Sequence, residues 1–530
     1  MSETQAEKTV EKNPKRFHLS GIRRMMLSGG YGNFGANTTK NATIGWLMNG
    51  GSPEEDIDRN TAVLRQRARD LDVNGGLARG ANITMTTNIV GVGLVPKPKP
   101  DGKLLGLKEK EAAEWIDTCK REFELWAGSK KCGADLQMDF FQLQELAMRS
   151  QLVSGDSFAL LPMFQTPGTP YQTHVRLLEA DRICTENCGY GGVGSVRELQ
   201  DGGKIVDGVE MDKSGVVVAF WIADRHPLGM SGAAIKWTRV EAYGKNTGMP
   251  NVLHMMKFER PEQRRGVPFI SAMILTLKQL TRYTEAELMS NVIRAMFTVF
   301  IKQSTEGAGS TGTIDEIVGE AERVTQSDER LELGAGAVIQ LKPGEDIISA
   351  NPGGPNTNYD KYFESLCLLI ASSLGIPKSI LIKKFESNYT AARGELLEFW
   401  KEVRLWRMGL VRDFCQPCYE AFLAEAVATG RIAAPGFFES DAARAAWCKV
   451  QWQGSTMGSV DPKKEADAAM IRINGNLSTG EREAAEINGS DFFENAAQRD
   501  REIKAAPKTG AVPVEQDPNS DDEEEGKEDA

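Results

Sequence analysis

The longest regular pattern of apolar positions in this chain begins at Pro268. From there, apolar residues recur at the three- and four-residue spacing of one helix face, with charged residues between them. The stripe consists of Ile270, Met273, Ile274, Leu277, Leu280, Tyr283, Leu288, Val292, Met296 and Val299. It predicts one helix of roughly 35 residues, about 50 Å long and so much longer than an average globular helix. Another element must run beside such a helix, which favours a structural strut over a catalytic domain.

A second helix is predicted over residues 359–374. Between the two helices, residues 303–358 are interrupted by glycine and proline and are typical of short strands and turns. Two helices on either side of a small insert are expected to form an antiparallel pair with the insert at its tip.

The preceding part of the chain, residues 61–267, is predicted to be an α+β domain. Two helices meet at Gly75-Gly76, the second closing at Gly91 and Gly93, and further helices are expected over 107–127 and 140–154. Alternating patterns predict strands over 155–164, 174–183, 207–225, 236–244 and from Val252. Arg65, Arg67 and Arg69 of the first helix are interpreted as a solvated face, with Asp70 and Asp72 nearby.

The C-terminal third is predicted to be helical. One stripe carries Phe399, Val403, Trp406, Leu410 and Phe414, and Pro417 is expected to kink or end that helix because it lacks a backbone donor. Farther on, Asp461-Pro462 predicts a helix start and Gly475 its end. Ser478 and Glu481 then have the spacing of a capping box.

Composition and charge describe a large soluble chain with an uneven charge distribution. The 530 residues are 41% hydrophobic and carry a net charge of −11. Residues 511–530 contribute nine acidic side chains and one lysine, which leaves −3 for residues 1–510. A protein that grips DNA through its phosphates needs a clustered basic face, and this nearly neutral body does not predict one. If DNA is a partner, we expect it to be conducted past the protein rather than held.

Neither a membrane span nor a secretory signal is expected. The uncharged run in the long helix ends at Lys278 after about a dozen residues, short of the roughly 20 that cross a bilayer. The N-terminus lacks the apolar core of a signal peptide, so the chain is expected to stay in the cytoplasm where it is made.

Signatures of catalysis are sparse. Cys415 and Cys418 form a single CxxC with Cys448 as the nearest further thiol, which leaves a zinc site as the minor alternative to buried, reduced thiols. Gly244-Lys245-Asn246-Thr247 lacks the upstream glycine of a phosphate loop, and the glycines at 189, 191, 192 and 194 favour a hairpin loop. Common hydrolase motifs are absent. We therefore expect neither enzyme activity nor a cofactor or metal, with a nucleotide- or metal-dependent enzyme as the alternative.

Several motifs together resemble one protein family. They are His254, Arg260-Pro261, Gln263 and Arg265-Gly266-Val267-Pro268 before the long helix; Asn88, Val90, Gly91 and Gly93; Glu179-Ala180-Asp181-Arg182 and Gly208-Val209-Glu210; Asn388-Tyr389-Thr390-Ala391-Ala392-Arg393; and the segment around 460–503. In this order, from about residue 56 to 503, the chain resembles lambda-type bacteriophage portal proteins. Thr390 and Ala391 replace the two serines of the family's Asn-Tyr-Ser-Ser-Ala-Arg motif.

The resemblance implies a multidomain α+β portal fold. Its expected parts are an N-terminal arm (1–60), an α/β wing (61–267), a first stem helix (268–303), a small α/β clip (304–356), a second stem helix (357–376), a channel loop (377–395), a wing helix region (396–445), a helical crown (446–505) and a disordered acidic tail (506–530). The two stem helices are expected to be long and antiparallel.

The resemblance also implies a function. Portal subunits form a ring of about twelve copies at one capsid vertex of the virion, through which double-stranded DNA is packaged and ejected. Implied partners are terminase, head-completion protein, and major capsid protein or scaffold. Lys383, Lys384, Asn388 and Arg393 are the candidates for residues near DNA in the channel, and for both lysines ordinary solvation remains an equal alternative. A minor capsid protein without a channel is the remaining alternative of another class.

Overall fold

The computed structural model describes residues 50–186, 196–229, 234–295, 299–303, 345–349, 358–385, 389–458 and 461–505. Its contacts divide the chain into Met1–Ser52 and Pro53–Ala530, and every helix and strand named below belongs to the second unit. The predicted arm up to residue 49, the glycines at 189–194, most of the predicted clip and the acidic tail lie outside the described residues.

The strands pair in antiparallel sheets. The order β4-β5-β6-β7-β8 makes a five-stranded meander, β3-β2-β9 makes a three-stranded sheet, and β1-β12 and β10-β11 are two-stranded. Their bounds are β1 Val95–Pro98, β2 Asp156–Leu160, β3 Arg176–Leu178, β4 Val196–Glu198, β5 Lys204–Val206, β6 Val209–Met211, β7 Val217–Ala223, β8 Trp237–Glu241, β9 Val252–Met256, β10 Val299–Gln303, β11 Glu345–Ser349 and β12 Val450–Gln453. The mixture of helix and sheet in the predicted domain is confirmed.

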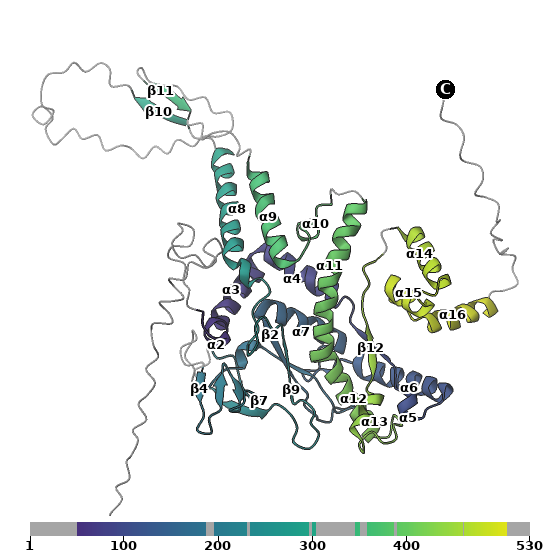
Figure 1. The fold of residues 1–530 in the computed structure, drawn as a ribbon. Coiled ribbons are helices and arrows are strands. Elements are labelled where there is room, and N and C mark those ends of the chain that lie inside the picture. Colours follow the sequence, from purple (N-terminus) through teal and green to yellow (C-terminus); the bar gives the residue numbers. More distant parts are fainter. Residues whose placement is uncertain are drawn as a thin grey trace, which may run out of the picture. The chain divides into compact units, whose positions relative to one another are not determined.

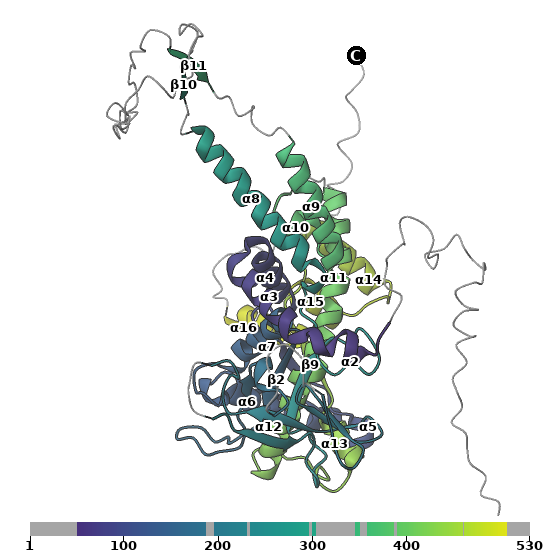
Figure 2. The same cartoon turned by 90° about the vertical axis from the view of Figure 1, so that its left-hand side faces the viewer.

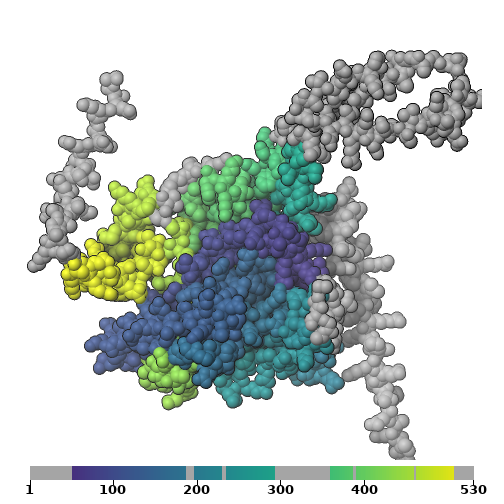
Figure 3. Space-filling model, turned by 180° about the vertical axis from the view of Figure 1, so that it is seen from behind, coloured from purple at the N-terminus to yellow at the C-terminus, as the bar shows by residue number. Residues whose placement is uncertain are grey.

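The other regular elements of the described residues are helices and short turns. They are α2 Pro53–Asp56, α3 Thr61–Asn74, α4 Gly76–Ile89, α5 Gly102–Leu105, α6 Glu109–Ala127, α7 Phe140–Ser154, α8 Ile274–Ala295, α9 Tyr359–Leu374, α10 Lys378–Leu381, α11 Tyr389–Leu410, α12 Gln416–Ala428, α13 Asp441–Trp447, α14 Pro462–Asn474, α15 Gly480–Ile487 and α16 Phe492–Ala505, with short 3-10 turns η1 Asp58–Asn60, η2 Lys130–Cys132, η3 Ala180–Arg182 and η4 Ser271–Met273. Figure 1 shows α7 beside β2 and β9, with α11 running past them. In Figure 3, α3 and α4 (purple) lie between the blue and the green parts of the chain.

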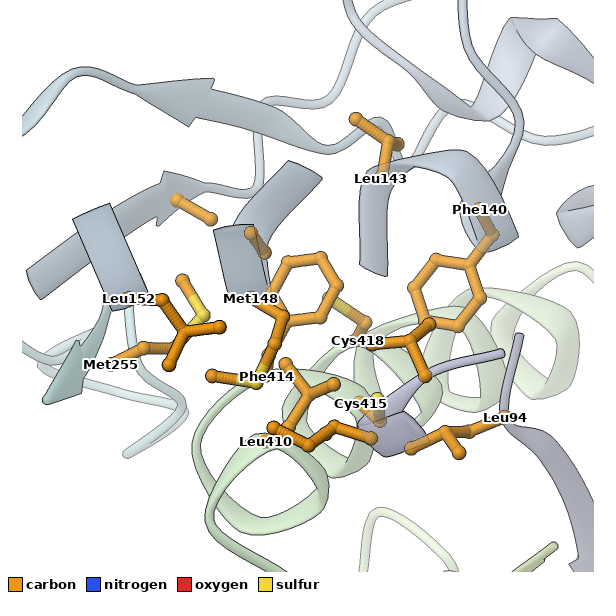
Figure 4. Packing of buried hydrophobic residues seen from close by; sticks show 14 of the residues in the cluster. Leu94, Phe140, Leu143, Met148, Leu152, Met255, Leu410, Phe414, Cys415 and Cys418 are labelled. Carbon is orange, nitrogen blue, oxygen red and sulfur yellow. The ribbon is translucent and has the colours of Figure 1, made fainter. Parts of the chain in front are cut away.

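The core is built mainly from α6, α7, α11 and α12. Phe140 of α7 stacks on Phe414 with ring centroids 5.8 Å apart, and Phe123 of α6 meets Phe422 of α12 edge-on at 5.3 Å. Figure 4 shows Phe414 among Leu410, Met148 and neighbouring apolar side chains. The predicted stripe faces this core, because Phe399, Val403 and Leu410 of α11 and Phe414 just after it are all buried.

The long helix predicted over 268–303 is shorter than expected. It is preceded by the turn η4 and extends over 22 residues as α8, and residues 299–303 form β10 instead. The sequence Thr298-Val299-Phe300-Ile301 is β-branched and aromatic, which favours a strand when a partner such as β11 is available. The helical prediction was therefore wrong for its last residues.

The helix predicted over residues 359–374 is confirmed, because α9 has these bounds. Figure 1 and Figure 2 show α8 and α9 as an antiparallel pair, and the two helices contact each other. None of the described helices is long and apolar enough to cross a lipid bilayer.

Pro417 interrupts its helix as predicted. The α-helix α11 ends at Leu410, and a five-residue π-helical segment, Val411–Cys415, leads into α12 with Pro417 in its first turn. Because proline has no N–H to donate, a widened turn just before it accommodates the missing backbone hydrogen bond.

Two boundaries near the C-terminus differ from the predictions. Residues 446–453, assigned to the crown, belong to the body, because Trp447 and Cys448 are in its core and β12 pairs with β1. Asp461 caps α14 as predicted, but the cap of α15 is Thr479 rather than Ser478, and its hydroxyl accepts from the N–H of Arg482.

The predicted channel loop also contains a helix, α10, and the start of α11.

Candidate functional site

The contact between α8 and α9 is the first part of the candidate site. Tyr283 of α8 stacks on Tyr359 of α9 with ring centroids 5.6 Å apart, and Tyr362 meets it edge-on at 5.2 Å. Toward the body, Leu277, Leu280 and Ile370 are buried in the core. The pair therefore has a base that is packed into the core of the chain.

Other apolar side chains of the pair are uncovered in the single chain. Leu275 is 75% exposed and Leu288 66%, and Met289, Leu368 and Leu369 are all more than half exposed. Scattered exposed leucines are ordinary, but several on two adjacent helices form the kind of surface that contacts another protein.

The predicted channel residues follow α9. Lys383 is exposed and has a backbone φ of +54°, while Lys384 forms an ion pair with Glu364 of α9 at 3.1 Å. Lys378 contacts the same carboxylate at 2.8 Å. The two neighbouring lysines therefore differ: Glu364 offsets the charge of Lys384, and Lys383 is exposed with a left-handed backbone.

The other two channel candidates are not gathered with the lysines. Arg393 in the first turns of α11 forms an ion pair with Glu465 of α14 at 2.8 Å. Asn388 lies outside the described residues. For Arg393, the contact indicates a link to the C-terminal helices.

A buried charge centre lies at the base of α8. It consists of Asp58, Arg65, Asp156, Asp181, Asp207, His254 and Arg265, which come from η1, α3, β2, η3, a turn, β9 and the loop before η4. Arg265 and Asp156 have no exposed side-chain surface. Because charges are costly to remove from water, such a cluster persists only where each charge is paired.

Arg265 is the hub of this centre. Its Nε donates to Asp156 at 2.6 Å, and its Nη1 donates to the carbonyl of Ile183 and to the Asp207 carboxylate, each at 2.7 Å. Its Nη2 donates to the carbonyl of Ala180 at 2.8 Å. A planar guanidinium with five donors suits this arrangement, which ties the loop before α8 to both larger sheets.

Arg65 corrects one prediction. It was interpreted as solvated, yet it is 2% exposed and donates to Asp181 at 3.1 Å, with Asp156 at 3.6 Å. Its neighbour Arg69 pairs with Glu179 at 3.1 Å, and only Arg67 of the three is exposed. The helix pattern alone cannot show carboxylates that lie about ninety or more residues farther along the chain.

The pKa values in the centre follow from burial and pairing. Burial alone would raise the pKa of Asp156, but Arg265, His254 and Arg65 together lower it well below its usual range. Burial lowers the pKa of His254, so its ring is neutral near pH 7. Burial raises the pKa of Asp58 to about 6, although it accepts the backbone N–H groups of Arg265 and Arg264.

The raised pKa of Asp58 predicts that the stability of the protein depends on pH. Since folding raises its pKa from 3.8 to about 6, the stability it contributes is complete below about pH 4 and is lost as the pH rises through 6. Asp58→Asn keeps an acceptor oxygen and cannot ionise. We expect its stability relative to wild type to increase between pH 4 and pH 7, by about 2 kcal/mol. Urea unfolding at several pH values measures this, and a constant difference would contradict the assignment.

Two glycines allow the chain to cross itself beside Asp156. A Cβ on Gly266 would lie 1.9 Å from the carbonyl oxygen of Gly155, and Gly155 itself has a φ of +92°. Phe269, three residues after Gly266, is held at the same place, because its N–H donates to the carbonyl of Leu152 at the end of α7. The path of the chain into α8 therefore depends on close contact between the backbone at Gly266 and the backbone at Gly155.

Sequence reasoning missed Asp58 and Asp156, the two most buried carboxylates among the described residues. For Asp156 a signal was present: an aspartate follows Gly155 and opens the apolar strand β2, where acidic residues are rare. Asp58 had no comparable signal, because it lies in a polar stretch.

The chemistry of the candidate ligands does not favour a metal site. Cys415 and Cys418 are buried in the apolar core, as Figure 4 shows, and burial raises both thiol pKa values well above their usual value, which disfavours the thiolates that zinc requires. Among the described residues, one group has metal-ligand spacing: Glu179, Asp181 and His226. Arg69 already pairs with both of its carboxylates, so a guanidinium occupies the place of a cation.

The phosphate-loop alternative is disfavoured as well. Gly244 to Thr247 lie in a turn between β8 and β9, where Gly244 and Met249 are joined by a backbone hydrogen bond. A phosphate loop needs a strand followed by a helix N-terminus. This segment is followed by a strand, so the motif lacks the helix that binds phosphate.

Sequence comparisons agree with the expected family. The family described as "Phage portal protein, lambda family" matches residues 39–407. The portal protein B of Escherichia phage lambda is 23% identical over 492 residues, covering 88% of this chain and 89% of that protein. The portal protein of Escherichia phage N15 is 24% identical over 496 residues, covering 89% of each.

Comparison with solved structures finds chains of gene transfer agent particles. A chain in the virion of a native particle covers 80% of this chain and 92% of its own length, with 14% identity and a TM-score of 0.39. A chain in the neck of the native particle is similar, with 13% identity and the same TM-score. The family match spans well over half of the sequence, from before α3 to within α11, and the protein therefore belongs to the lambda family of phage portal proteins.

Proposed function

We propose that this chain is the portal subunit of a bacteriophage, a structural protein that assembles in the host cytoplasm into a ring of about twelve copies at one capsid vertex of the virion. The family match over residues 39–407 carries the proposal. The uncovered apolar side chains of α8 and α9 support it, because copies placed side by side would bury them.

The ring conducts double-stranded DNA during packaging and ejection. Outside its acidic tail the chain is nearly neutral, with a net charge of −3 over residues 1–510. Strong contacts to successive phosphates would hold the duplex at fixed positions, so a nearly neutral conduit lets it pass in either direction. Terminase docks on this ring, and head-completion protein and major capsid protein or scaffold are its other partners.

The segment 377–395 faces the channel in this proposal, with Lys383, Lys384, Asn388 and Arg393 near DNA. Lys383 is the best placed of the described candidates, since it is exposed, whereas Glu364 pairs with Lys384 and Glu465 with Arg393.

Replacing Lys383 and Lys384 by alanine tests the conduit. We expect less DNA packaged or retained in an in vitro packaging reaction with the cognate terminase, while the rings stay intact, because only two local positive charges are removed. Lys245→Ala is the matched control, since Lys245 is 78% exposed in a hairpin of the wing. Unchanged packaging with normal rings would remove both lysines from the channel.

A minor capsid protein without a channel is the competing structural function. It would share α8 and α9 without forming a closed ring with an open centre. Packaging separates the two, because heads assembled without a portal subunit should contain no DNA.

A further inference from the structure

The three C-terminal helices, α14, α15 and α16, share little apolar packing with the rest of the chain. We call them the C-terminal module. Among the described residues, the main hydrophobic core has no member from these helices. Ala469 and Glu483 are their only buried described residues, while Ile471, Phe493 and Ile503 are each at least 65% exposed. Apolar burial therefore does not explain how the module is attached.

Charged side chains join the module to the body. Lys97 of β1 lies 2.8 Å from Glu481 of α15 and 3.0 Å from Asp491, which precedes α16. Lys120 of α6 adds ion pairs with Asp491 at 3.4 Å and with Glu494 at 2.6 Å. With Lys99, which lies 3.3 Å from Glu481, three lysines of the body face three carboxylates of the module, so their charges balance.

The centre of this cluster is shielded and its edge is open. The side chains of Lys97 and Asp491 are 11% and 9% exposed, whereas Glu481, Lys99 and Glu494 are exposed by about a third to two thirds. Salt screens exposed pairs strongly and buried pairs less. The outer pairs are therefore weakened first.

An open cleft accompanies the ion pairs. Its volume is about 1330 Å³, and it is lined on the body side by residues such as Lys120 and Gln453 and on the module side by Asp491 and Glu494. A cleft of this size keeps the two surfaces from packing closely. Beyond it, Arg393 and Glu465 make one more ion pair, and the hydroxyl of Thr456 donates to the carbonyl of Ile487.

We infer that the C-terminal module is a releasable element, held to α6 and β1 by an ionic latch of Lys97, Lys99 and Lys120 against Glu481, Asp491 and Glu494. When the latch opens, the module separates from the body while both keep their own folds. The device belongs to the single chain and does not depend on ring formation.

Charge reversal at Lys120 should change the acetylation rate of Lys97 in opposite directions, depending on whether the C-terminal module is released. Lys120→Glu places a negative charge beside Asp491 and Glu494. If the module stayed in place, the added negative charge would hold the proton on Lys97 and slow its acetylation. If the latch opens, Lys97 becomes exposed and is acetylated faster, by about threefold or more.

The experiment is acetylation of the full chain with acetic anhydride, read by mass spectrometry at Lys97. We expect faster labelling in Lys120→Glu, and also in wild type when NaCl is raised from about 0.05 M to 1 M. The double swap Lys120→Glu with Glu494→Lys should return the rate toward that of wild type. Lys245→Glu reverses a charge in an exposed pair of the wing and is the matched control.

Slower or unchanged labelling of Lys97 in Lys120→Glu would overturn the latch. Unfolding is a separate outcome: it would also expose amides of α7 and α12, which hydrogen exchange on the same samples detects. A double swap that labels as fast as the single variant would likewise contradict an electrostatic attachment.

Discussion

Alanine at Gly266 is expected to destabilise the protein by about 3 kcal/mol or more. The added Cβ would lie 1.9 Å from the carbonyl oxygen of Gly155, and the contacting atom is backbone, so no side chain can turn away to make room. The clash displaces the loop that carries Arg265, and with it the start of α8. Thermal unfolding and the yield of soluble protein measure the loss.

Gly80→Ala is the matched control for this substitution. Gly80 lies within α4, and a Cβ there would meet no atom within 4 Å. Alanine in the interior of a helix is favoured over glycine by about 0.5–1 kcal/mol, so this variant should be slightly more stable than wild type. Equal stability of Gly266→Ala and wild type would contradict the crossing of the two backbones.

Methionine at Arg265 is expected to cost about 3–5 kcal/mol, because it leaves a buried carboxylate without its main partner. Asp156 would keep Arg65 at 3.6 Å, the neutral His254 and the backbone N–H of Gly266, and the carbonyls of Ile183 and Ala180 would lose the Arg265 donor. Methionine fills much of the space, so the loss reports the charge and hydrogen bonds rather than a cavity. The midpoint of urea unfolding measures it.

Arg260→Met provides the comparison. Arg260 pairs with Asp56 at 2.8 Å in the same loop, but both side chains are more than 40% exposed, and such pairs contribute about 1 kcal/mol or less. A loss as small for Arg265→Met as for Arg260→Met would show that the buried centre does not stabilise the base of α8.

Elements defined by local signals were predictable from the sequence. The ends of α7 and α9 match their periodic patterns, and the Asp461-Pro462 cap starts α14 as expected. Pro417 lies in the first turn of α12, directly after a π-helical segment, because its missing N–H acts locally. The glycines of Arg265-Gly266-Val267-Pro268 and of the motif ending in Gly93 also sit where a side chain would clash.

Features that depend on distant partners were not predictable. Arg65 looks like any surface arginine until Asp156 and Asp181 are brought to it by folding. Residues 299–303 continue a helical pattern but pair as a strand, because β11 supplies the partner from more than forty residues away. Glu481 was expected to cap its own helix and instead reaches Lys97 and Lys99.

The charge centre and the helix pair belong to one arrangement. Arg265, Gly266 and Pro268 lead within a few residues into η4 and α8, so the centre fixes the point where the helix leaves the α+β part of the chain. In the proposed ring, each copy of α8 and α9 must project at the same angle for the exposed side chains of neighbours to meet. Such repetition requires that the base of α8 and α9 be rigid in every copy.

Negative-stain electron microscopy of the purified full-length protein tests the proposed ring most directly. We expect closed rings of about twelve copies with an open centre wide enough for double-stranded DNA. Protein that remains monomeric at every concentration, or that assembles into particles without a central opening, would contradict the account.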